Sequence, residues 1–284
     1  MLPVVDTHQH LWDLSKLRLP WLKPGGDLSR SFVMKDYLQA TAGLNVVKSV
    51  YMEVDVAPED KVAEAEYVVD LCKQQDNPTC AAVVGGRVAE PGFKDYIMRF
   101  KGSPYVKGVR QIIGKPGQCL EDAFVKGVQL LGELGMSFDI CTGPTLLAEA
   151  AKLVEQCPDT RFVVDHCGNV PPKSLLPDGD KTVADGWRRD MARLAKTGGD
   201  RIICKLSGIV ASLPRGKWTP DDLAPALNAC IETFGPERCV WASESAKTPT
   251  VFLLRLATAM ILRISSSTRG CSIWPGMPRD CERS

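Results

Sequence analysis

Three histidines are the side chains of this sequence best suited to chemistry, and they lie in two short motifs. His8 and His10 belong to Val-Asp-Thr-His-Gln-His at 5–10, and His166 belongs to Val-Val-Asp-His-Cys-Gly at 163–168. Histidine is the commonest metal ligand and the usual acid or base near neutral pH. Each motif closes a short apolar, β-branched run, which is typical of a strand end. The pattern predicts an enzyme.

The spacing of His8 and His10 places both imidazoles on one face of a strand and Gln9 on the other. Two imidazoles at the end of a strand suit a divalent metal, with Zn²⁺ the first choice for mixed nitrogen and oxygen ligands. The alternative is a pair of histidines with ordinary hydrogen-bond partners. His166 precedes a turn signal at 167–169. We expect it to ligate the metal or polarise a substrate carbonyl, and a turn histidine bonded to the backbone is its alternative.

Four other polar side chains end or interrupt apolar runs and are candidate substrate-binding residues. Arginine offers a planar, two-pronged donor that suits a carboxylate or carbonyl group. A structural ion pair within the fold is the alternative for the charged members of this set. The four residues are Glu53, Arg110, Asp139 and Ser207.

Glu244 ends the last predicted strand, after Cys-Val-Trp-Ala-Ser at 239–243. A carboxylate beside a histidine cluster is the group needed to deprotonate a hydrolytic water. We therefore expect Glu244 to be catalytic, together with His166. Its alternative is an ordinary exposed acid.

These residues need a scaffold in which the ends of distant strands meet, and the chain shows the pattern of one. Strands alternating with helices favour a parallel α/β architecture, and eight strands close a (β/α)₈ TIM barrel with its active site at the carboxyl ends. A doubly wound open sheet would carry a glycine-rich phosphate turn after its first strand, where this chain has His-Gln-His. We predict strands at 4–8, 46–53, 79–88, 106–112, 136–141, 161–165, 201–206 and 238–243, and helices at 58–73, 121–134, 145–156, 183–197 and 220–234.

The composition excludes several classes of protein. A net charge of +1 supplies no basic surplus for nucleic-acid binding. The apolar stretch at 251–262 contains Arg255 and is too short to span a membrane, and no secretory signal opens the chain. The eleven cysteines are scattered without a C-x-x-C pair, which favours a reduced, cytoplasmic protein. We expect the partner to be a small-molecule substrate, anionic or polyhydroxylated.

Five segments together resemble the amidohydrolase superfamily, in the amidohydrolase-related branch that contains L-fuconolactonases and 2-pyrone-4,6-dicarboxylate lactonase. The resemblance implies a (β/α)₈ barrel that hydrolyses a small cyclic ester, with His8, His10 and His166 at the family's histidine positions and Arg110 at a substrate-binding arginine. Members of the branch differ in whether they need a metal. The segments are Val-Asp-Thr-His-Gln-His-Leu-Trp-Asp at 5–13, Leu-Pro-Trp-Leu at 19–22, Gly-Val-Arg at 108–110, Val-Asp-His-Cys-Gly at 164–168 and Phe-Gly-Pro-Glu-Arg at 234–238.

The sequence departs from this family at the eighth strand. The family pattern there has Ser-Asp-Trp-Pro, whereas this chain has Ser-Glu-Ser-Ala at 243–246. We find no resemblance from there to the end, and residues 245–284 carry a net charge of +4 against −3 for residues 1–244. We therefore expect a barrel domain at 1–244 with an aberrant last βα unit, and an atypical tail at 245–284 with a helix at 250–262. An altered reading frame near codon 244 would produce this change, and translating the other frames tests it.

Three functional hypotheses follow. The first is a hydrolase that opens a small lactone with activated water, with a divalent metal or with the imidazoles alone. The second is a metal-dependent nonoxidative decarboxylase, because a related branch uses a similar barrel and opening motif. The third is a catalytically impaired barrel, which the exchange of Asp for Glu244 and the altered tail favour.

Overall fold

Eight parallel strands follow one another around a single sheet, in the order in which they occur in the chain. The computed structural model describes residues 2–214 and 217–244. Every strand pairs in parallel with the next one, as alternation with helices requires. The strands are β1 (Val4–Gln9), β2 (Val46–Met52), β3 (Thr79–Gly85), β4 (Val106–Ile113), β5 (Ser137–Thr142), β6 (Arg161–Val164), β7 (Ile202–Leu206) and β8 (Cys239–Trp241).

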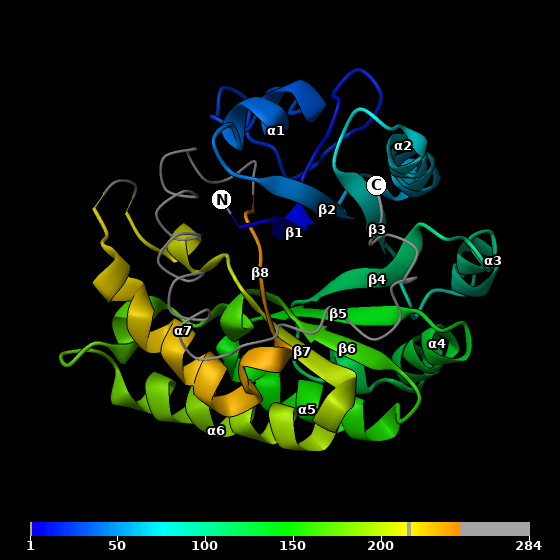
Figure 1. The fold of residues 1–284 in the computed structure, drawn as a ribbon. Coiled ribbons are helices and arrows are strands. Elements are labelled where there is room, and N and C mark those ends of the chain that lie inside the picture. Colours follow the sequence, from blue (N-terminus) through cyan, green and yellow to red (C-terminus); the bar gives the residue numbers. More distant parts are fainter. Residues whose placement is uncertain (1, 215–216, 245–284) are drawn as a thin grey trace.

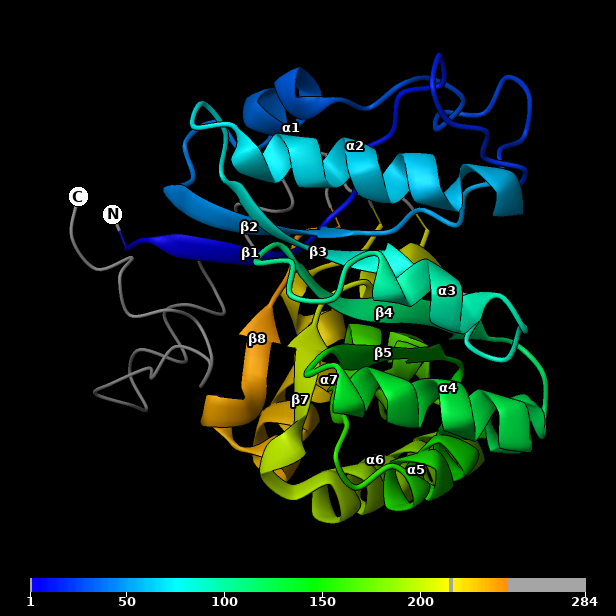
Figure 2. The ribbon, with the colours of Figure 1, turned by 90° about the vertical axis from the view of Figure 1, so that its right-hand side faces the viewer.

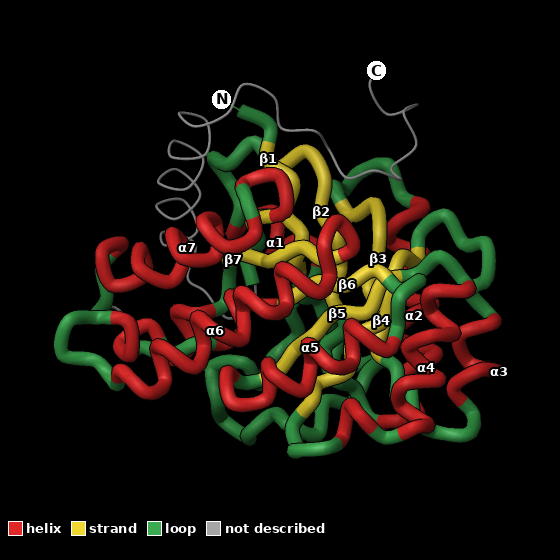
Figure 3. The backbone as a smooth tube through the Cα atoms, turned by 90° about the horizontal axis from the view of Figure 1, so that it is seen from below, coloured by secondary structure: helices red, strands yellow, loops and turns green. Residues whose placement is uncertain are grey.

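Helices connect the strands and surround the sheet, so the strands lie inside and the helices outside (Figure 1; Figure 3). Seen from the side, α1 and α2 lie over β1 to β3, and α3 and α4 lie beside β4 and β5 (Figure 2). This arrangement confirms the predicted TIM barrel. The helices are α1 (Met34–Ala40), α2 (Lys61–Lys73), α3 (Phe93–Met98), α4 (Asp122–Glu133), α5 (Leu147–Gln156), α6 (Lys181–Gly198) and α7 (Pro220–Phe234).

Local sequence signals explain where the long helices begin. Asp180 caps α6 by accepting hydrogen bonds from the backbone of Thr182 and Val183. At α7, the backbone N–H of Thr219 donates to the Asp222 carboxylate at 2.7 Å, and Pro220 occupies the first helical position.

A seam separates β8 from β1, where the structure records no strand ladder between the described residues. Side chains and one backbone bond cross it instead. The Thr7 hydroxyl donates to the Trp241 carbonyl at 2.7 Å, and the Glu244 N–H donates to the His8 carbonyl at 3.1 Å. The buried Asp6 carboxylate accepts from both the N–H and the hydroxyl of Ser243. The barrel is therefore nearly closed, and β8 is shorter than predicted because Ser243 bonds to a side chain rather than to a strand.

The main core fills the space between the sheet and its helices, with aromatic rings in edge-to-face contact. The rings of Phe124 and Phe138 are 5.7 Å apart, and those of Phe138 and Phe162 are 6.4 Å apart. A second, smaller apolar cluster stabilises the long loop at 10–33, where Trp12 pairs with Phe32 in an antiparallel bridge. This loop follows β1 and therefore begins at the carboxyl end of the barrel.

Several expectations fall on residues that the structure does not describe. The atypical tail at 245–284 and its helix at 250–262 lie outside the described residues. The nine cysteines in the described part of the chain are free thiols. No helix in that part has the length and apolar character needed to cross a membrane.

Candidate active site

His8 in β1 and His10 directly after it meet at their Nε2 atoms, which are 3.0 Å apart. Both rings are buried. They lie on the same side of the chain, as the alternation of strand side chains predicts. The Nδ1 atom of His10 lies 3.0 Å from the Met52 carbonyl oxygen, which can only accept, so His10 carries its proton on Nδ1 and a lone pair on Nε2. Gln9 points the other way, and its Oε1 accepts from the Thr79 hydroxyl at 2.8 Å.

His166 joins them from the end of β6, although it is more than 150 residues away in the sequence. Its ring centroid lies 4.6 Å from that of His8. The Ser207 hydroxyl lies 2.9 Å from His166 Nδ1 and fixes the ring. His166 has φ of +53°, a conformation that non-glycine residues seldom adopt. Gly208, with φ of +68°, leaves room for this ring, because a Cβ there would come within 2.4 Å of it.

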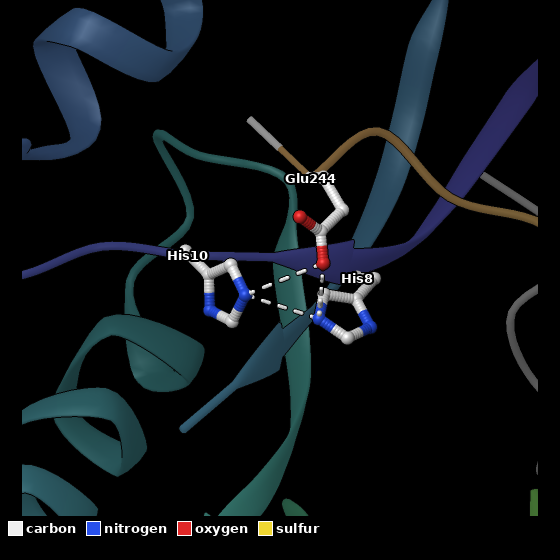
Figure 4. Close-up of side chains that lie close together, drawn as sticks. All are labelled: His8, His10 and Glu244. Atoms are coloured by element: carbon white, nitrogen blue, oxygen red, sulfur yellow. Dashed lines mark hydrogen bonds and ion pairs between the residues drawn. The ribbon is translucent and has the colours of Figure 1, made fainter. Parts of the chain in front are cut away.

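Glu244 brings a carboxylate to the three imidazoles, and Figure 4 shows it beside two of them, His8 and His10. Its Oε1 lies 2.7 Å from His166 Nε2, 3.4 Å from His8 Nε2 and 3.9 Å from His10 Nε2. Glu244 is buried and has φ of +55°. Strained backbone at two of four converging residues is typical of a functional site, where surrounding contacts hold the strain in place. The prediction that the histidines and Glu244 come together is confirmed by these distances.

Arg110 and Glu53 form a buried ion pair beside His8. Arg110 Nε donates to Glu53 Oε1 at 2.7 Å, and Nη2 donates to the Glu53 carbonyl at 2.8 Å. The remaining nitrogen, Nη1, faces the histidines and lies 3.4 Å from His8 Nε2. Arg110 and Glu53 therefore form the structural ion pair that was the alternative to substrate binding for these residues. One guanidinium nitrogen still points at the histidines. The roles of Arg110 and Glu53 in substrate binding stay predictions.

Asp139 lies deeper, in an ion pair with Lys205, a residue that sequence analysis missed. Lys205 Nζ lies 2.6 Å from Asp139 Oδ2 and 3.1 Å from Asp165 Oδ1. The same Nζ is 3.4 Å from His8 Nδ1. Burial raises the pKa of Asp139 to about 6, while Lys205 opposes this shift. The signal that could have revealed Lys205 is a single charge inside the apolar run 202–206, on the face of β7 that the alternation turns inward.

The surroundings of His8 disfavour its charged form. Burial lowers the pKa of His8 well below its usual value, and Lys205 lowers it further. Among the described residues, buried carboxylates outnumber buried cations around the histidines, because Asp6, Glu53, Asp139, Asp165 and Glu244 lie there with Arg110 and Lys205. A buried imbalance of this kind is costly unless it is compensated.

The site has the donor set for a divalent metal. His8, His10 and Glu244 place one ligand atom each within 4.8 Å of one another, and a second group consists of His8, Asp165 and His166. In a tetrahedral zinc site with bonds of ~2.1 Å, ligand atoms lie ~3.4 Å apart. The pairs in the first group are separated by 3.0, 3.4 and 3.9 Å. A divalent cation would also offset the excess of buried carboxylates, so the residues fit such an ion.

Comparisons with known proteins agree with this geometry. The family model described as amidohydrolase (Amidohydro_2) matches residues 5–283, a range that includes the tail in which we find no family motif. The uncharacterized protein y4mH of Sinorhizobium fredii is 24% identical over 261 residues, which cover 84% of each chain.

Solved structures share the fold. An amidohydrolase from Burkholderia multivorans with bound HEPES superposes with a TM-score of 0.77 at 21% identity, covering 95% of this chain and 93% of that one. A second crystal form of it, with bound zinc, gives a TM-score of 0.75 at 20% identity over the same shares. A probable 2-pyrone-4,6-dicarboxylic acid hydrolase from Acinetobacter baumannii with citric acid bound gives 0.68 at 12% identity, covering 91% and 92%.

The match to the family model runs over nearly the whole length, and the histidines that carry the sequence resemblance meet at one end of an eight-stranded barrel. The chain belongs to the amidohydrolase family.

Proposed function

We propose that this protein is a hydrolase that opens a small lactone by the attack of an activated water molecule. The observation that carries the proposal is the position of the Glu244 carboxylate, whose Oε1 lies within 3.9 Å of one ring nitrogen from each of the three histidines. A carboxylate base beside imidazoles suits ester hydrolysis, because a proton leaves water while negative charge develops on the carbonyl oxygen.

The proposed substrate is anionic or polyhydroxylated. Arg110 Nη1 points at His8 while its other nitrogens are held by Glu53, so one rigid cationic donor is directed at the reacting region. The A. baumannii neighbour is named for a dicarboxylic acid and holds citric acid. These observations support a lactone that carries a carboxylate or several hydroxyls near its ring.

The reaction proceeds through a tetrahedral intermediate. Glu244 accepts a proton from water as the water oxygen forms a bond to the lactone carbonyl carbon. His8 lies beside the carbonyl oxygen as it becomes negative, and His166 donates a hydrogen bond there or to the leaving group. When the intermediate collapses, the bond from the carbonyl carbon to the ring oxygen breaks, and that oxygen takes the proton that Glu244 removed from water, which gives a hydroxy acid and restores the carboxylate.

We further propose that His8, His10 and Glu244 can hold a divalent metal, with zinc the first candidate because of the B. multivorans relative. When bound, the ion would polarise the carbonyl and neutralise developing charge. The protein's own contribution is to present two imidazole nitrogens and one carboxylate oxygen at distances that suit the ion.

A panel of lactones tests the proposed function. Sugar lactones and 2-pyrone-4,6-dicarboxylate are incubated with the purified full chain, and ring-opened acid and released CO₂ are both measured. We expect acid without CO₂, and a loss of at least a hundredfold in kcat/KM for His8→Ala and His166→Ala. Glu232→Gln, an exposed change on α7, is the matched control.

The other outcomes each contradict the proposal in a different way. Release of CO₂ would make the protein a decarboxylase. Undiminished turnover in both histidine variants would remove these side chains from the mechanism. No turnover of any lactone by a folded, metal-supplemented protein would make it an impaired barrel.

A further inference from the structure

Near its carboxyl end, β4 turns two side chains into the barrel, Arg110 and Ile112. Arg110 faces the histidines, since its Nη1 lies 3.4 Å from His8 Nε2. Side chains alternate between the two faces of a strand, so Ile112, two residues further on, points into the barrel as well. Its neighbour Ile113 lies on the outer face, in the main core. Ile112 is 48% exposed, which places it at the open mouth of the barrel rather than in packed interior.

Cys141 on β5 lies beside Ile112. In the parallel pairing of β4 with β5, Arg110 is opposite Asp139 and Ile112 is opposite Cys141. The Asp139 carboxylate points into the barrel, where it binds Lys205, so Cys141, two residues further on, points there too. Its side chain is a free thiol and is only partly buried. The two side chains therefore stand next to each other on the inner face, one step closer to the mouth than Arg110 and Asp139.

Cys141 is close to the charges of the site and carries none itself. The charges of Arg110, Asp165 and Glu244 all act on its thiol. Burial raises the pKa of this thiol to about 12, so it is uncharged near neutral pH and resembles a small apolar side chain. Ile112 and Cys141 thus form a neutral patch beside charged residues, which we call the apolar wall.

The polar residues next to the apolar wall lie on the other face of their strands. Gln111 on β4 accepts a hydrogen bond from the Val88 N–H at 2.8 Å. Thr142 on β5 donates one to the Ile113 carbonyl at 2.8 Å. A ligand that contacts the apolar wall therefore meets a hydrocarbon side chain and a thiol, which is a weak hydrogen-bonding group. A ligand hydroxyl placed there would lose its bonds to water without a good replacement, and this weakens binding.

We propose that Ile112 and Cys141 determine substrate specificity by packing against an apolar face of the substrate ring, while the carboxylate of the substrate lies at Arg110. Residues two apart along a strand are separated by ~6.6 Å, so a ligand with one small ring can contact both Arg110 and the apolar wall. The inference rests on the proposed lactone hydrolysis and narrows its substrate. Of the anionic and the polyhydroxylated lactones, the site takes anionic ones whose ring carries few hydroxyls.

Two unreactive acids test the apolar wall without requiring turnover. Cyclohexanecarboxylate and quinate share a six-membered carbon ring with a carboxylate, and quinate adds several ring hydroxyls. Their dissociation constants are measured by isothermal titration calorimetry on the purified full chain. An apolar pocket discriminates against an added hydroxyl, so we expect wild type to bind cyclohexanecarboxylate about tenfold or more tightly than quinate.

Variants assign this preference to the apolar wall. Ile112→Thr and Cys141→Ser each introduce a hydroxyl with little change of size, and the double variant should reduce the preference to about twofold or less, mainly by weakening cyclohexanecarboxylate. Val47→Thr/Cys80→Ser makes the same chemical changes toward the amino ends of β2 and β3. Val47 is 47% exposed and Cys80 is partly buried, so this matched control should keep the wild-type preference.

The inference is overturned if wild type binds the two acids equally, prefers quinate or binds neither. An unchanged preference in the Ile112→Thr/Cys141→Ser variant also overturns it, and the single variants decide if the double variant does not fold. A preference that is lost equally in the matched control would show an effect of stability rather than of contact.

The binding assay needs no turnover, so it separates this inference from the proposed function. A failed lactone panel alongside the expected affinities would reject only the proposed hydrolysis. A successful panel in which polyhydroxylated lactones have the higher kcat/KM would reject only the role of the apolar wall. For a lactone with an apolar ring face, the Ile112→Thr/Cys141→Ser variant should raise KM about tenfold and leave kcat within about twofold of wild type.

Discussion

Glu244 combines several unfavourable features in one residue. Its backbone lies in the left-handed region, its carboxylate is buried, and this carboxylate approaches three imidazoles. Such a side chain is held by its neighbours rather than by its own preferences. It also gives the site a carboxylate one methylene longer than that of the aspartate that the family resemblance implies.

Glu244→Gln should fold and lose activity. The amide keeps the size of the side chain but cannot accept a proton from water, so we expect kcat to fall by about 10²–10⁴-fold. Circular dichroism and thermal unfolding check the fold, and initial rates on the best lactone check the activity. Glu244→Asp should also lose about tenfold or more, because withdrawal of the carboxylate by about 1 Å breaks its contact with His166. Activity in Glu244→Gln equal to wild type would exclude this carboxylate as the base.

At this scale the sequence predicted some residues and missed others for a physical reason. His8, His10, His166 and Glu244 follow apolar runs, and strand ends in a barrel converge. Lys205 lies inside a strand, where its charge is explained only by partners on other strands. No spacing within the chain reveals those partners.

At the scale of elements, strand ends and the turns after them aim the side chains. All eight strands were predicted, because each apolar run is bounded by polar turn residues and separated by amphipathic helices. The helices α1 and α3 were not predicted, since seven and six residues are too few to show a helical period. The sequence predicted a turn after β6. It could not predict the positive φ angles of His166, Cys167 and Asn169, which only the structure shows.

Gly208→Ala should displace His166. A methyl group there would overlap the imidazole, so we expect kcat to fall at least tenfold and the free energy of unfolding to fall by about 1–2 kcal/mol. Gly135→Ala is the matched control, because Gly135 has φ of +70° and open space around its Cβ position. It should lose similar stability and keep its activity. Equal activity in the two variants would mean that the space beside His166 is unimportant.

Ser243→Ala should weaken the seam and the site together. The change removes the hydroxyl that bonds to Asp6, which costs about 1 kcal/mol of unfolding free energy, and it loosens the residue next to Glu244. Thr160→Val removes a buried hydroxyl bond to the Val128 carbonyl, at the start of β6, and serves as the control. Chemical denaturation should show comparable losses, whereas kcat should fall only in Ser243→Ala. A normal kcat there would separate the seam from catalysis.

At the scale of the whole molecule, one buried acid outside the site should shape the response to pH. Glu64 on α2 is fully buried, and its Oε1 accepts from the Tyr51 hydroxyl at 3.0 Å and from the Val54 N–H at 2.7 Å. Burial raises its pKa from 4.5 to about 7, and nearby Glu53 adds to the shift. Between these two values the folded protein holds a proton that the unfolded chain has released, so stability from Glu64 is lost as pH rises through 7.

Glu64→Gln should remove this contribution. Between pH 5 and pH 8, the unfolding free energy of wild type should fall by on the order of 1–3 kcal/mol more than that of the variant, as measured by urea denaturation. Glu66→Gln makes the same chemical change at an exposed position on the same helix and should follow the wild-type profile. Parallel profiles for wild type and Glu64→Gln would show that Glu64 does not titrate in this range.

The seam between the first and last strands has a consequence for how the protein matures. The bonds that join Ser243 and Glu244 to Asp6 and His8 are also the bonds that deliver the base to the histidines. Under the proposed mechanism, a chain whose final strand has not docked would retain seven strands and every imidazole, yet it would be inert toward an ester. Catalytic competence would then require the closed seam, and turnover would measure how many molecules have completed the ring.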